Sequence, residues 1–176
     1  LSIVPCKRFG KPNLNPYFRV ADVQCFLATR AGEPVGTIAA TVDHNYQRED
    51  PRAGFFGFFE FIDDASVSQA LFGAATAWLR ERGMDRALGP FNFNSNHEFA
   101  LLVDGFDTDP LVANPHNGRW YERHYLALGL EPRMRRGRGP LVRAGSGSCG
   151  ARASARRRTR GVNPSSRRRR GRSRGG

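Results

Sequence analysis

Runs of apolar and strand-forming residues recur through the first two thirds of the chain. The segments 24–29 (Gln-Cys-Phe-Leu-Ala-Thr) and 35–42 (Val-Gly-Thr-Ile-Ala-Ala-Thr-Val) flank a short turn sequence, and they predict an antiparallel hairpin. Residues 54–62 are apolar at almost every position, which is typical of a central strand covered on both faces. Gly54 and Gly57 inside this run indicate that another backbone or a ligand approaches closely there.

A helical repeat of apolar residues follows over residues 66–82. Ser66 and Gln69 form a capping-box pattern at its start. The next apolar segment, residues 86–91, predicts a short strand that Pro90 stops. A strand, a helix and a strand within about 38 residues predict a βαβ unit with parallel strands. The apolar face of the predicted helix consists of Val67, Leu71, Ala74, Ala75 and Trp78.

The remaining segments carry weaker patterns. Residues 1–20 contain several prolines and predict an irregular lead-in, whereas residues 92–117 predict a long connection of the kind that often carries function. Residues 118–128 predict a second, shorter helix. The hairpin and the βαβ unit together indicate the α/β fold class, with a mixed, mostly antiparallel sheet.

Charge divides the chain after residue 132. Residues 1–132 hold 12 of the 28 Lys and Arg residues and all 16 Asp and Glu residues, so this part carries a net charge of −4. Residues 133–176 hold the other 16 basic residues, all of them Arg, and no acidic residue. With hardly an apolar side chain, this tail cannot bury enough surface to offset its chain entropy, and we expect it to be disordered. The prediction is one domain over residues 1–132 followed by an Arg-rich tail.

Three cysteines, Cys6, Cys25 and Cys149, are widely spaced and form no Cys-x-x-Cys pair, which favours a reducing, cytoplasmic setting. No apolar run reaches the roughly 20 residues of a membrane helix, and no signal-peptide pattern is present, so we expect no membrane contact. His44, His97, His116 and His124 show no metal-ligand spacing, and we expect no metal site.

Two stretches carry a more specific pattern. One is residues 70–85 (Ala-Leu-Phe-Gly-Ala-Ala-Thr-Ala-Trp-Leu-Arg-Glu-Arg-Gly-Met-Asp), and the other is residues 125–131 (Tyr-Leu-Ala-Leu-Gly-Leu-Glu). They resemble the long helix behind the cofactor loop and the Tyr-x-x-x-Gly-Phe end of the last helix in the GNAT-type N-acetyltransferase superfamily. Residues 54–60, 89–93 and 101–106 are similar to a poorly characterised bacterial branch of GNAT-like proteins.

This resemblance implies an acyl-CoA N-acyltransferase (GNAT) fold and transfer of an acetyl group from acetyl-CoA to a small-molecule or peptide amine. Members of that branch continue into further strands after the last helix, whereas this chain turns into arginine repeats at Arg133. We therefore expect the closing hairpin of the sheet to be absent, so that the domain is incomplete at its C-terminus. The 26 Arg against two Lys suggest the hypothesis that the tail is a shifted reading frame in a GC-rich gene.

In the superfamily, backbone amides of the loop before the long helix cradle the pyrophosphate of acetyl-CoA, as any helix N-terminus attracts phosphate. The matching residues in this chain are Ser66, Val67, Ser68 and Gln69, which are the predicted cofactor-binding residues. Asp63 stands where the family has a basic or amide residue, and its charge repels phosphate. The alternative interpretation is that the acidic and hydroxyl residues of this loop only cap the helix.

Transfer to an amine needs a base for the amine proton and an acid for the leaving thiolate. Tyr125 is the predicted acid, because the resemblance places the family's catalytic tyrosine there; packing at a helix end is the alternative. Glu60 is the predicted base, since a carboxylate in an apolar strand should have a raised pKa; a solvent-facing glutamate at a strand end is the alternative.

Polar residues of the long connection are the predicted substrate-binding groups: Asn94, Asn96 and Glu98, with Asp104 as a further candidate. Two other classes of function stay open. The Arg-rich residues 133–176 could bind nucleic acid unspecifically through phosphate contacts. The chain could also be a GNAT-shaped binding module without catalysis, whose altered loop no longer holds coenzyme A.

Overall fold

The computed structural model describes residues 1–6, 15–93, 96–109, 115–136 and 139–144. Within these residues one seven-stranded sheet has the strand order β1-β2-β3-β4-β5-β7-β6. Two helices accompany it, together with two short 3-10 turns, η1 (Pro16–Arg19) and η2 (Tyr46–Arg48). The strands are β1 (Ser2–Pro5), β2 (Ala21–Arg30), β3 (Glu33–Asp43), β4 (Ala53–Phe61), β5 (Arg86–Gly89), β6 (Leu130–Arg136) and β7 (Gly139–Ala144), and the helices are α1 (Ala65–Glu81) and α2 (Tyr121–Ala127).

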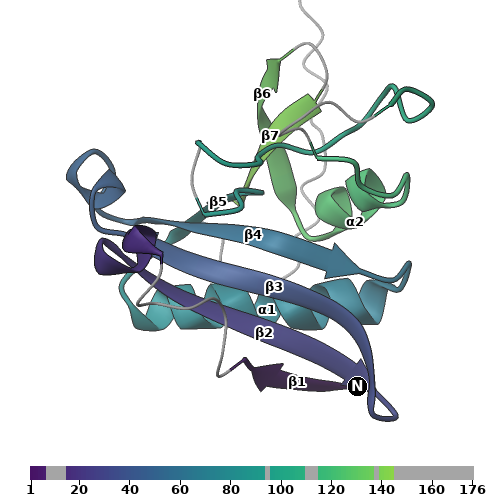
Figure 1. Ribbon diagram of the computed structural model, residues 1–176, viewed down its shortest axis with the longest axis horizontal. Helices are drawn as coiled ribbons and strands as arrows, with labels where there is room; N and C mark the ends of the chain where they lie inside the picture. Colours follow the sequence, from purple (N-terminus) through teal and green to yellow (C-terminus); the bar gives the residue numbers. More distant parts are fainter. Residues whose placement is uncertain (7–14, 94–95, 110–114, 137–138, 145–176) are drawn as a thin grey trace, which may run out of the picture.

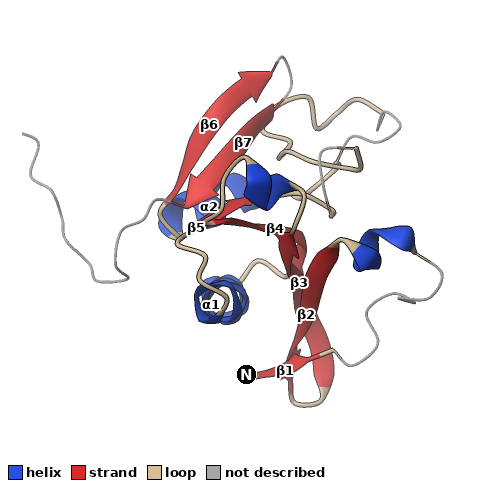
Figure 2. Cartoon of the chain, turned by 90° about the vertical axis from the view of Figure 1, so that its left-hand side faces the viewer, coloured by secondary structure: helices blue, strands red, loops and turns tan. Residues whose placement is uncertain are grey.

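The predicted hairpin and βαβ unit are both confirmed. β2 and β3 pair antiparallel, and β3 pairs antiparallel with β4. β4 and β5 are parallel neighbours on either side of α1 in sequence, and β7 then pairs antiparallel with β5. Helix α1 lies across one face of strands β2 to β4, as Figures 1 and 2 show. The sheet is therefore mixed and mostly antiparallel, in an α/β fold.

The apolar face of α1 forms the main core with that face of the sheet. Val67, Leu71 and Ala75 are fully buried along the helix, at the spacing of three and four residues that the sequence predicted. They pack against Ile38 and Phe56 from the central strands, which are also fully buried. Burial of about 1.5 to 3 kcal/mol per large apolar side chain is the main force that holds α1 on the sheet.

Gly57 allows a second segment of backbone to cross β4. A Cβ atom at this position would lie 1.7 Å from the carbonyl oxygen of Phe91, which belongs to the segment after β5. The Phe91 amide donates to the Phe56 carbonyl at 2.8 Å, so the two segments are in direct contact. The prediction of close approach at Gly57 is confirmed, and at Gly54 the approaching group is the side chain of Leu79.

β4 contains a bulge immediately beyond this crossing. Thr37 pairs with Glu60 and Ala39 pairs with Gly57, so β4 has one more residue than β3 between these two paired positions. Phe58 has a positive φ of 46° within the bulge. Bulges of this kind re-aim the following side chains and are frequent beside functional sites.

Two expectations about where elements begin are wrong. Residues 2–5 form the edge strand β1 rather than an irregular lead-in, because they pair with β2. The cap of α1 is Asp64, whose side chain accepts from the Ser66 amide at 2.8 Å, so the predicted Ser66 cap lies two residues too late.

A further expectation that is wrong concerns the closing hairpin, which we expected to be absent. Residues 130–136 and 139–144 form β6 and β7, and β7 is inserted between β5 and β6. The expectation of disorder from residue 133 is wrong for these two strands, since backbone pairing with β5 can hold a segment that has few apolar side chains. Residues 145–176 lie outside the described part of the chain.

Candidate functional site

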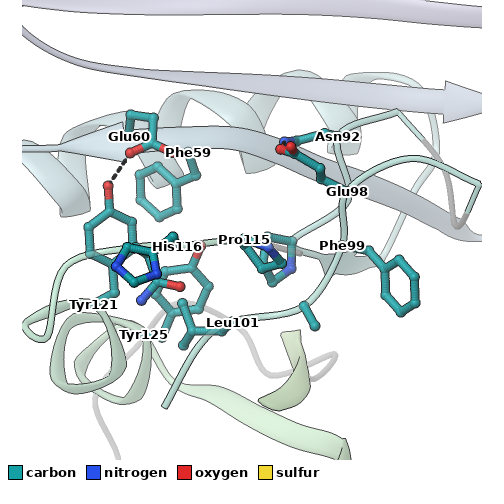
Figure 3. Close-up of a pocket in the computed structure, with 13 residues that line it drawn as sticks. Phe59, Glu60, Asn92, Glu98, Phe99, Leu101, Pro115, His116, Tyr121 and Tyr125 are labelled. Carbon is teal, nitrogen blue, oxygen red and sulfur yellow. Dashed lines mark hydrogen bonds between the residues drawn. The ribbon is translucent and has the colours of Figure 1, made fainter. Parts of the chain in front are cut away.

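A cavity of about 210 Å³ lies beyond the point where β4 and β5 separate. The two strands stay paired as far as Phe55 and Leu88, after which the bulged end of β4 and the connection after β5 diverge. The carboxyl ends of parallel strands are where open α/β sheets bind ligands. The lining of the cavity comes from β4, from the connection after β5 and from α2, as Figure 3 shows. It includes Glu60, Asn92, Glu98, Leu101, Tyr121 and Tyr125.

The Tyr121 hydroxyl donates a hydrogen bond to Glu60 Oε2 across the cavity wall. The same hydroxyl accepts from the Phe61 amide at 3.3 Å, so one oxygen ties α2 to the end of β4. Tyr121 is only 4% exposed. Burial and the hydrogen bond to Glu60 raise the pKa of Tyr121, which keeps its proton on the phenol. Glu60 is exposed near the end of β4, as in the alternative of a solvent-facing glutamate, and its carboxylate lines the cavity.

Tyr125 lies one helical turn after Tyr121 and is 1% exposed. Its ring packs against Phe56 and Phe59, with centroid distances of 6.1 and 5.6 Å. Burial and the neighbouring Tyr121 and Glu60 raise its pKa well above the ordinary value. Its hydroxyl forms no hydrogen bond with any residue that the structure describes. A buried hydroxyl without a partner is uncommon, and this one belongs to the lining of a cavity.

Asn92 organises the opposite wall. Its Oδ1 accepts from the Phe58 amide at 2.7 Å, which satisfies a donor that the bulge withdraws from the sheet. Its Nδ2 donates to Glu98 Oε2 at 3.1 Å, and its backbone N–H donates to the backbone carbonyl of Glu98 at 2.8 Å. Asn92 therefore couples the bulge to Glu98, and sequence reasoning did not identify it.

Backbone amides at the N-terminus of α1 already have hydrogen-bond acceptors within the protein. Asp64 accepts from the Ser66 amide through its side chain and from the Val67 and Ser68 amides through its carbonyl, each of these two at 3.2 Å. Arg30 donates to the Asp64 carboxylate at 2.7 Å. The hydrogen bonds from Ser66 and Arg30 hold the pKa of Asp64 well below its usual range.

A second chain of contacts links α1 to α2. Ser68 Oγ lies 2.9 Å from His124 Nδ1, and His124 Nε2 lies 2.9 Å from Asp63 Oδ1. Ser68 and His124 are both buried. Arg123 donates to the same Asp63 oxygen, and the hydrogen bonds from Arg123 and His124 lower the pKa of Asp63. The order Ser–His–Asp matches that of a nucleophile triad, but the buried Ser68 hydroxyl also donates to the Ala65 carbonyl at 3.1 Å. The contacts fix α2 against the start of α1.

Comparison with known proteins gives bacterial relatives. No protein-family model matches the chain, and no solved structure matches it. It is 44% identical over 107 residues to protein YghO of Escherichia coli K12, and 47% identical over 108 residues to a bacterial ceramide synthase of Caulobacter vibrioides. Each match covers 60% of this chain but only 27% and 28% of the relative, so the chain spans little more than a quarter of their length.

The cavity brings together part of the predicted site. Glu60, Tyr125 and Glu98 line it, but Asn96 does not, and Asn94 lies outside the described residues. Asp104 is exposed and accepts from the Gly105 amide. The four predicted cofactor residues sit at the α1 N-terminus: Ser66 and Gln69 are exposed, whereas Val67 and Ser68 are buried.

The described residues contain no group of three side chains that could hold a metal ion. Among the same residues, no helix is both long and apolar enough to cross a membrane.

Proposed function

We propose that this chain is a GNAT-type acyltransferase domain that forms an amide between an acyl group, expected from acetyl-CoA, and an amine. The observation that carries the proposal is the group Glu60, Tyr121 and Tyr125 at the bulged end of β4, where a cavity opens between parallel strands. The name of the Caulobacter relative supports it, because a ceramide is an amide of a long-chain amine and a fatty acid. The strands β6 and β7 also supply the continuation of the sheet that the resemblance requires.

Glu60 is the base in this proposal. Its carboxylate accepts the proton that the amine loses while the nitrogen forms its bond to the acyl carbon and the carbon–sulfur bond breaks. Tyr121, whose proton is held by burial, orients the carboxylate through one oxygen and leaves the other available. Its role is positioning.

Tyr125 stabilises the departing sulfur. Because burial raises its pKa well above that of a thiol, the phenol keeps its proton and acts mainly by hydrogen-bond donation. Proton balance is completed when the proton taken by Glu60 passes through solvent to the released thiolate.

The pyrophosphate contact at α1 fits less well. The Asp64 carboxylate already accepts from the Ser66 amide, the Asp64 backbone carbonyl accepts from the Val67 and Ser68 amides, and Asp63 adds a second carboxylate beside them. Phosphate would have to displace this capping carboxylate against its charge. This specific observation favours the second candidate, a GNAT-shaped module without coenzyme A binding.

Two measurements on the full chain test the proposal. Thermal unfolding with excess acetyl-CoA should occur at higher temperature than without it, because a ligand that binds only the native state stabilises it. Mass spectrometry should detect the amide product from acetyl-CoA and a primary alkylamine. Glu60→Gln should lower the rate by about 100-fold or more, whereas Glu81→Gln, on the exposed end of α1, should not change it. Absence of both the shift and the product would leave the non-catalytic module.

A further inference from the structure

Two carboxylates at the cavity have no positive partner among the described residues. Glu60 accepts from the neutral hydroxyl of Tyr121, and Glu98 accepts from the neutral amide of Asn92. By contrast, described carboxylates elsewhere, such as Asp50, Asp63 and Asp64, form ion pairs with arginines. No Lys or Arg is among the described residues that line the cavity. The described lining also contains the imidazole of His116, and neither carboxylate forms an ion pair with it. A cation that enters the cavity is attracted by both carboxylates.

A second, independent feature indicates that a polar ligand enters. Tyr125 is 1% exposed, its hydroxyl has no hydrogen-bond partner among the described residues, and it belongs to the lining of the same cavity. A buried hydroxyl in this state costs free energy that a ligand group can recover by bonding to it. The aromatic rings of Phe59 and Phe99 complete the wall with apolar surface. A volume of about 210 Å³ suits a small head group rather than a whole ligand.

We propose that the cavity selects a positively charged amine head whose neighbouring substituents are uncharged, and that Glu98 is the residue that sets this selectivity. An amine with an adjacent carboxylate or phosphate group would bring a negative charge toward Glu60 and Glu98, and no Lys or Arg of the described lining would offset it. The inference rests on the proposed function only in taking the ligand as the acyl acceptor; the binding selectivity itself does not require catalysis.

A matched pair of amines tests the selectivity on the full chain. Norleucinol and norleucine share one skeleton and one ammonium group, and they differ in carrying a neutral alcohol or a carboxylate beside it. Isothermal titration without any acyl donor should give norleucinol at least about tenfold tighter binding than norleucine, which corresponds to the Coulomb energy of one partly screened pair. 1-Hexanol, which lacks the ammonium group, should bind more weakly than norleucinol.

The variants connect the selectivity to Glu98. Glu98→Gln keeps the shape of the side chain and an acceptor for Asn92, and it should reduce the preference for norleucinol to less than about threefold. Glu81→Gln removes an exposed carboxylate on α1 and should leave the preference unchanged. Equal binding of the two amines, binding of hexanol as tight as that of norleucinol, or an unchanged preference in Glu98→Gln would each overturn the proposal.

The same experiment separates this inference from the proposed function. Selective binding of norleucinol without amide formation in the presence of acetyl-CoA would keep the amine site and refute the acyltransferase. Amide formation from both amines at equal rates would keep the acyltransferase and refute the selectivity.

Discussion

The Tyr121 hydroxyl donates to the Glu60 carboxylate and thereby joins two residues 61 positions apart in the sequence. The same hydroxyl also accepts from the Phe61 amide, so this contact holds α2 against the end of β4 beside the cavity. The bulge in β4 makes the contact possible, because the extra residue changes which face of the strand carries Glu60. The Glu60 and Tyr121 side chains thus connect the bulged end of β4 to the first residue of α2.

Tyr121→Phe should destabilise the protein by about 1 to 3 kcal/mol, since it leaves the buried Phe61 amide without its acceptor. Urea unfolding followed by circular dichroism measures this loss. Tyr46→Phe is the matched control, because no hydrogen bond of the Tyr46 hydroxyl occurs within the described residues, and its unfolding midpoint should stay within error of the parent. Equal midpoints for the two variants would contradict the role of the Tyr121 hydroxyl.

Gly57→Ala should be among the most damaging single substitutions, with a loss of about 3 kcal/mol or more. The new Cβ would lie 1.7 Å from the Phe91 carbonyl oxygen, so the crossing segment would have to move off the strand. Gly73→Ala is the opposite case, because nothing lies within 4 Å of a Cβ at this helical position. It should stabilise the protein by about 0.5 to 1 kcal/mol, and thermal denaturation of the two variants would show whether the order holds.

The framework of the sheet could be predicted because its signals are local. Apolar runs and the helical repeat fix the hairpin, β4 and α1, and connection rules then make β4 and β5 parallel. The pairing of β6 and β7 could not be predicted in this way, because residues 133–144 lack an apolar alternation and are held by backbone pairing across the sheet. The edge strand β1 was missed for the same reason.

The site was predictable only in part. Glu60, Glu98 and Tyr125 were identified, but Tyr121 and Asn92 were not. A sequence signal for Tyr121 exists, since residues four positions apart share one face of a helix and Tyr125 was already a candidate. Asn92 has no such signal, because its role depends on a bulge that becomes visible only when β3 and β4 are set in register.

The thiol of Cys25 should be unreactive in the folded protein. Cys25 is 3% exposed, and burial is the main cause that raises the pKa of its thiol to about 11. Because the thiolate is the nucleophile, iodoacetamide at pH 8 should leave this residue unmodified. Peptide mass mapping before and after the addition of urea measures the difference. Rapid labelling of Cys25 without denaturant would show that β2 opens to solvent more readily than its pairing on both sides indicates.

Asp63 should make stability depend on acid through its contacts with Arg123 and His124, which lower its pKa in the folded state. A lowered folded-state pKa contributes stability that is present above the unfolded value, near 3.9, and is lost as pH falls from there toward the folded value. Asp63→Asn removes this contribution. The urea midpoint of the variant should therefore lie below that of the parent at neutral pH, and the two curves should converge as pH falls below about 4. Asp109→Asn changes an exposed carboxylate for which no described residue provides an ion pair, and its curve should follow the parent throughout. A constant gap between Asp63→Asn and the parent down to low pH would show that the substitution acts by lost packing rather than by lost charge.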